Sequence, residues 1–158
     1  MATTQRRLVI GISGASGVAY GIRALEVLRG SGIETHLVMT RSAELTLAYE
    51  TNLKLRDVHA LASVVHKAED VGASIASGSF RTLGMLVAPC SIRTLSEVAY
   101  GQTTSLLFLT QAERRVAFAH IDHVLTTTEI VARSVRNGRG DGSDHVPMMV
   151  DLALVGER

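Results

Sequence analysis

The chain has 158 residues, and its balance of 46% hydrophobic and 20% charged residues is typical of a single globular domain, which excludes a disordered or fibrous chain. A net charge of +1 offers no electrostatic attraction for nucleic acid or for an anionic membrane surface. Because no apolar stretch approaches the roughly 20 residues of a membrane-spanning helix and no secretory leader is recognisable, we expect a cytoplasmic protein with residues 1–158 as one domain.

The first part of the chain predicts a βαβ unit. Arg7–Ile12 is a short apolar and β-branched run, and after a glycine-rich turn apolar residues recur at helical spacing over residues 18–28. Gly30 marks the end of that helix, and Glu34–Met39 then alternates as a second strand. A crossover of this length favours a parallel sheet with a right-handed connection.

The remainder alternates further helices, strands and loops. We expect helices over Ser42–Tyr49, Leu55–Val65, Arg93–Tyr100 and Ile121–Arg136, strands over Leu83–Ala88 and Ser105–Leu109, and loops over Ala73–Phe80 and, with a flexible glycine-rich character, over residues 137–146. The order of elements predicts an α/β fold of the flavodoxin-like (Rossmann-like) type, a three-layer sandwich with a mainly parallel sheet.

The turn Gly11–Gly17 lies where ligands bind in such a sheet, beyond the carboxyl end of a strand. Its small residues let backbone N–H groups approach an anion, Ser13 and Ser16 add hydroxyl groups, and the following helix points its positive end there. The turn has neither the spacing of a dinucleotide fingerprint nor the lysine of a P-loop, which favours a mononucleotide. The alternative is a plain tight turn with a capped helix.

A second turn, Ala88–Thr94, again follows a predicted buried strand and precedes a helix. Ser91 and Thr94 are suited to donate hydrogen bonds to a phosphate or to the edge of a ring, and Arg93 brings a permanent cation. The alternative interpretation is a serine cap on the helix with Arg93 exposed.

Other reactive residues are few. Cys90 is the single cysteine, so it forms no intrachain disulfide and serves either packing or local chemistry. His66 is either a base near the ligand or a surface histidine at a helix end. His120 and His123 have no third ligand at suitable spacing, so we expect no metal.

Four segments share their residues with one family. They are Gly11–Gly17 with Tyr20 and Gly21, Glu34–Met39, Ala76–Phe80 and Ala88–Ser96. Together they resemble the UbiX and Pad1 flavin prenyltransferases, within the superfamily of homo-oligomeric flavin-containing cysteine decarboxylases. The resemblance runs from about Arg7 to about Leu109.

The resemblance implies FMN as cofactor, with the phosphate at the first turn, a flavin-contacting hydroxyl after the second strand, and the flavin along the second turn. It also implies a trimer-based homo-oligomer, commonly a dodecamer. Taken with the residue patterns above, the candidate cofactor-binding residues are Ser13, Gly14, Ala15, Ser16, Thr40, Ser91, Ile92, Arg93 and Thr94.

Beyond Leu109 the resemblance to the prenyltransferases ends. Gln111 stands where those enzymes have an arginine, and their later Arg-Glu-Thr-Pro strand and tyrosine segment, which help to bind the prenyl phosphate, are missing. We therefore expect a flavin-dependent oxidative decarboxylase of a cysteine-containing peptide or small thiol acid, with Arg93, Cys90 and His66 as candidate catalytic residues. The alternatives are a flavin prenyltransferase that makes prenylated FMN from dimethylallyl phosphate, and a non-catalytic flavin carrier.

Overall fold

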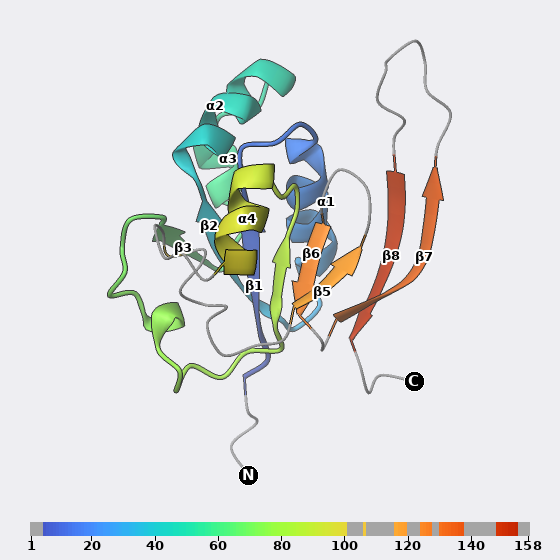
Figure 1. Cartoon of the computed structure of the whole chain (residues 1–158). Helices are drawn as coiled ribbons and strands as arrows, with labels where there is room; N and C mark the ends of the chain where they lie inside the picture. The colour runs from blue at the N-terminus through green and yellow to red at the C-terminus, as the bar shows by residue number, and fades with distance from the viewer. Residues whose placement is uncertain are drawn as a thin grey trace.

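The computed structural model describes residues 5–100, Leu106 and four later segments, all of them strands: 116–119, 124–127, 130–137 and 148–154. Its larger sheet has six strands in the order β3-β2-β1-β4-β6-β5, and a second sheet pairs β7 with β8 (Figure 1). The strands are β1 (Arg7–Ile12), β2 (Glu34–Met39), β3 (Val64–Lys67), β4 (Met85–Val87), β5 (Val116–Ala119), β6 (Val124–Thr127), β7 (Ile130–Asn137) and β8 (Met148–Leu154). The helices are α1 (Val18–Leu28), α2 (Arg41–Glu50), α3 (Leu55–His59) and α4 (Ile92–Tyr100), with a 3₁₀ turn at Ser74–Ala76.

The first four strands of the larger sheet form its parallel part. β1 lies between β2 and β4 and runs parallel to both, and β3 pairs in parallel with the far side of β2. Five of the six residues in β1 and in β2 are buried, as expected for strands covered on both faces. β6 and β5 extend the sheet in antiparallel fashion.

Two apolar clusters lie on opposite faces of this sheet, because successive side chains of a strand point to opposite sides. One contains Ile10 and Leu37 from the strands with Leu25 of α1 and Leu47 of α2. The other contains Val9, Val38 and Val87 with Ile75 of the 3₁₀ turn and Leu106, and α4 packs against it. The predicted three-layer α/β fold with a mainly parallel sheet is therefore confirmed.

Three predicted elements are wrong. The helix expected over Leu55–Val65 ends at His59, and Val64–Lys67 is strand β3, because its backbone pairs with β2. The helix expected over Ile121–Arg136 is replaced by β6 and β7, whose many β-branched residues suit a strand. Of the strand expected over Ser105–Leu109 only Leu106 is described, and it is buried and helical.

The flexible loop predicted over residues 137–146 lies outside the described residues, except for Asn137 at the end of β7. Within the part of the chain that the structure describes, no helix combines the length and the apolar character needed to cross a membrane.

Candidate functional site

The two turns predicted to bind a ligand lie side by side, because β1 and β4 are neighbouring strands. The hydroxyl of Ser13 donates to the carbonyl of Pro89 at 3.1 Å and accepts from the N–H of Ser91 at 2.6 Å. The N–H of Ser13 also donates to Pro89 at 3.1 Å. Ser13 is only 1% exposed, so its hydroxyl joins the two turns and is not directed toward a cofactor.

Two glycines let neighbouring elements approach the first turn closely. A Cβ atom at Gly14 would collide with the side chain of Ser42, in the first turn of α2. A Cβ atom at Gly21 would collide with the backbone carbonyl of Ala88 at the end of β4. The absence of a side chain at both positions therefore brings α1, α2 and the two turns together at one edge of the sheet.

Thr40 lies at this edge as the residue that caps α2. Its hydroxyl accepts from the N–H of Ala43 at 3.2 Å and lies 3.0 Å from the hydroxyl of Ser42. Such a cap satisfies one of the free N–H groups of the helix start. The partly exposed Thr40 hydroxyl is thus held in place at the position predicted for a flavin contact.

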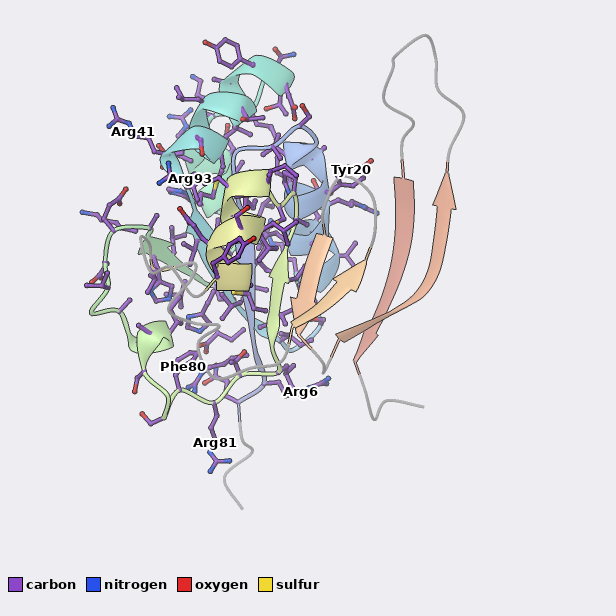
Figure 2. All side chains as sticks on the ribbon, viewed as in Figure 1. Arg6, Tyr20, Arg41, Phe80, Arg81 and Arg93 are labelled. Atoms are coloured by element: carbon purple, nitrogen blue, oxygen red, sulfur yellow. The ribbon has the colours of Figure 1, made fainter. Side chains whose placement is uncertain are left out.

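In the second turn, Ser91 caps the start of α4. Its hydroxyl accepts from the N–H of Thr94 at 3.2 Å and donates to the Thr94 hydroxyl at 3.0 Å. Ile92 and Arg93 are exposed, and the Arg93 guanidinium pairs with Glu97 at 2.8 Å. This is the capped-helix alternative, and it leaves Arg93 at the same edge as Arg41 of α2 (Figure 2).

The carboxylate of Glu50 is a site feature that the sequence analysis overlooked. It stands at the last residue of α2 and accepts hydrogen bonds from the N–H of Gly17 at 3.1 and 3.0 Å and from that of Val18 at 3.0 Å. A carboxylate of the chain itself thus occupies the amides where α1 begins, a position that favours negative charge.

The hydrogen-bond donors that remain for an external anion come from Gly14 and Ser16, just before the amides that bind Glu50. Within residues 5–100, no hydrogen bond engages the N–H of Gly14, the N–H of Ser16 or the hydroxyl of Ser16, which is exposed. The N–H of Ala15 is turned back toward the Ser13 carbonyl at 2.9 Å. The geometry therefore fits a phosphate group at Gly14–Ser16 and not at the helix start itself.

Cys90 and His66 do not lie open to this edge. Cys90 is fully buried in the second apolar cluster, and burial raises the pKa of its thiol to about 12. Because the thiolate is the reactive form of cysteine, the geometry favours a packing role. His66 lies on β3, where its ring contacts His36, and no described contact joins it to either turn.

Comparison with known proteins identifies the family. A family model described as Flavoprotein matches residues 2–118. The flavin prenyltransferase UbiX of Escherichia coli K12 is 57% identical over 103 residues, which cover 65% of this chain and 54% of the relative. The corresponding enzyme of Neisseria meningitidis serogroup B is 47% identical over 139 residues, covering 79% of this chain and 74% of the relative. The chain thus spans about half the length of the first relative.

Two solved structures share the fold. AnUbiX (PadA1), in complex with FMN and dimethylallyl pyrophosphate, has a TM-score of 0.66 and 44% identity, covering 68% of this chain and 57% of its own. A dodecameric FMN-dependent UbiX-like decarboxylase from Escherichia coli O157:H7 has a TM-score of 0.65 and 43% identity, covering 66% of this chain and 57% of its own.

The expectation of a cysteine decarboxylase is wrong. The curated relatives are named flavin prenyltransferases, and one solved relative holds dimethylallyl pyrophosphate beside FMN, which favours the alternative. That expectation gave too much weight to the altered residues beyond Leu109 and too little to the matched region, which contains both turns. The predicted flavin cofactor is confirmed at the level of the family, since the chain belongs to the flavoprotein family.

Proposed function

We propose that this chain is a flavin prenyltransferase of the UbiX type, which joins a dimethylallyl group to FMN. The observation that carries the proposal is the pair of turns connected through Ser13, Pro89 and Ser91. Both turns lie inside residues 2–118, the region that matches the flavoprotein family. The relatives with the strongest sequence similarity described above are named for this activity.

The residues at the carboxyl edge fit FMN in two ways and a prenyl donor in a third. The free N–H groups of Gly14 and Ser16 and the Ser16 hydroxyl are placed to bind its phosphate. The Thr40 hydroxyl is fixed by its cap on α2 and faces the same edge. The same edge carries the exposed cations Arg41 of α2 and Arg93 of α4, which suit the phosphate of a prenyl donor (Figure 2).

Bound reduced FMN would supply the atom to which the dimethylallyl carbon is joined, as the carbon–oxygen bond of dimethylallyl phosphate or pyrophosphate breaks and the phosphate leaves. Replacing a hydrogen on that atom releases one proton. Glu50 is suited to accept it, because its carboxylate is held at this edge by the N–H groups of Gly17 and Val18. Arg41 and Arg93 would stabilise the charge of the departing phosphate.

We further propose a trimer-based homo-oligomer. Leu45, Tyr49 and Leu53 recur four residues apart along and just beyond α2, and all three are exposed, Tyr49 by 88%. Exposed apolar residues that gather on one surface, here Leu45 and Tyr49 of α2 with Leu53 after it, are typical of a surface that a partner covers. The dodecameric relative from Escherichia coli O157:H7 supports a homo-oligomer for this chain as well.

The test is to incubate the purified protein with reduced FMN and dimethylallyl phosphate and to weigh the released flavin by mass spectrometry. We expect FMN that is heavier by one prenyl group. A reaction without the prenyl donor serves as the control. Bound FMN that stays unmodified with either the phosphate or the pyrophosphate donor would contradict the proposal and indicate a flavin carrier.

A further inference from the structure

A second polar cluster lies away from the two turns, between β2 and the edge strand β3. His36 stands at its centre: its Nδ1 lies 2.9 Å from Nε2 of His66, and its Nε2 lies 2.7 Å from Oε1 of Glu34. The two imidazole rings are stacked, with centroids 5.2 Å apart and planes inclined by 14°. The His36 side chain is only 5% exposed, so these two contacts satisfy both of its ring nitrogens.

The groups around this Glu34–His36–His66 cluster come from every neighbouring segment. Phe80 packs edge-on against His36 with centroids 5.0 Å apart, at the end of the sheet opposite to Arg93 (Figure 2). Arg7 of β1 lies over the Phe80 ring, and its Nε contacts Glu34 at 3.2 Å. The side-chain amide of Gln5 also donates to Glu34, and Asp70 after β3 acts electrostatically on His66.

The number of protons on the two rings decides whether the cluster can form. When both rings are neutral, His66 donates from Nε2 to Nδ1 of His36, and His36 donates from Nε2 to Glu34. One added proton is tolerated, because a cationic His36 can donate to His66 and to Glu34 at once. With two added protons, an N–H on each ring faces the other across 2.9 Å and both rings are cations, so that contact is lost.

The directions of the pKa shifts agree with this geometry. The pKa of His66 is lowered, chiefly by burial and next by the charge of His36, while Asp70 acts in the opposite direction. The pKa of Glu34 is lowered, chiefly by its hydrogen bond with His36. A histidine whose folded pKa lies below its ordinary 6.5 contributes stability that is complete above pH 6.5 and is lost as the pH falls below that value.

We propose that Glu34, His36 and His66 form a proton-controlled latch that holds β3 on the sheet at neutral pH and releases it when both imidazoles are protonated. β3 has four residues and is the first strand in the sheet order, so β2 alone pairs with it. Val64 and Val65 are exposed and add little burial. The latch is therefore the pH-dependent part of what fixes this strand, beside its backbone pairing with β2 and the hydrogen bonds that Ser63 exchanges with Thr35.

The test is hydrogen exchange of the full-length protein, followed by mass spectrometry of peptides that cover β3 and, as an internal reference, β1. Between about pH 7.5 and about pH 5, after correction for intrinsic exchange, we expect the protection of β3 to fall about tenfold while β1 keeps its protection. His66→Gln keeps a neutral donor toward His36, so its β3 should stay protected at both pH values. His59→Gln, which removes a histidine outside the cluster, should behave like the unmodified chain.

Equal loss of β3 protection in His66→Gln and in the unmodified chain would overturn the latch, as would parallel loss in β1. If His66→Gln does not fold, the unmodified chain still decides the matter through NMR titration of its imidazole signals. Two coupled steps, with the His66 step displaced to lower pH, are expected. Independent titration of His36 and His66 at ordinary values would overturn the proposal.

Discussion

The two turns at the carboxyl edge and the Glu34–His36–His66 cluster are polar structures on one sheet, and they hold it by different chemistry. The turns are joined by hydroxyl and backbone groups, such as those of Ser13 and Pro89, which keep one protonation state over the whole neutral range. The cluster depends on hydrogen bonds between imidazoles, whose pattern of donors and acceptors changes when a proton is added. We therefore expect acid to weaken the pairing of the edge strand β3, while the centre of the sheet, with the proposed flavin site, keeps its structure.

The largest expected effect is on the alkylation rate of Cys90, which tests whether the second turn stays closed. Its folded pKa of about 12, against an ordinary 9.0, leaves about a thousand times less thiolate, since each pKa unit is a factor of ten. We expect alkylation by iodoacetamide at about pH 8 to be slower by about that factor in the folded chain than in urea. Mass spectrometry over time measures both rates. Rapid alkylation without denaturant would show that the second turn opens.

Glu50→Gln tests the role of the carboxylate that is bound directly to the first turn. If it accepts the proton released in the reaction, kcat for prenyl transfer should fall about a hundredfold, the usual size of such a contribution. Flavin binding should persist. Glu44→Gln, on an exposed position of the same helix, is the matched control and should keep full activity. Loss of bound flavin in Glu50→Gln would instead indicate a purely structural role.

Gly21→Ala tests how tightly the turns are packed. The new Cβ atom would meet the Ala88 carbonyl, a backbone atom that cannot move without shifting β4. We expect the free energy of unfolding to fall by about 2 kcal/mol, a typical cost of overpacking. Gly72→Ala is the control, since its Cβ would lie 3.6 Å from the nearest atom. Urea titration of both variants measures the difference, and equal stability would show that α1 can move away from β4.

Ser13→Ala and Ser16→Ala separate stability from binding within one turn. The first leaves the partly buried N–H of Ser91 without its acceptor, at a cost of about 1 kcal/mol in the free energy of unfolding. The second removes an exposed hydroxyl, so stability should hold while FMN binds several-fold more weakly. Urea titration and flavin fluorescence give the two values. A Ser16→Ala variant that loses stability but not affinity would reverse the assignment.

Much of the first half of the fold was predictable, because its signals are local. β1 and β2 lie at the predicted residues, and α2 extends the predicted Ser42–Tyr49 by one residue at each end. The spacing of apolar residues and the glycines at the ends of elements identify such helices and strands within a short stretch of sequence. The failure at β3 has the opposite cause: Val64 and Val65 continue the apolar spacing of the residues before them, and only the distant partner β2 makes them a strand.

The two turns predicted to bind a ligand do lie side by side, but the partners of their side chains were not predictable from the sequence. Ser13 and Ser91 were read as ligands, whereas the structure uses them to join the turns and cap α4. Glu50 was overlooked because it reaches residues 32 and 33 positions away. For His36 a signal did exist, since it is a titratable residue directly before the apolar run Leu37–Met39 of a predicted strand.

The hydrogen bonds of Ser13 also constrain the order in which the molecule is made. They reach Pro89 and Ser91, 76 and 78 residues further along the chain. During synthesis the first turn therefore leaves the ribosome long before its partners, and it cannot close until β4 and the start of α4 have followed. Loop closure over such a distance favours late formation of the site. A nascent chain released before Ser91 would contain the complete glycine-rich turn and still lack the second turn that the proposed flavin site requires.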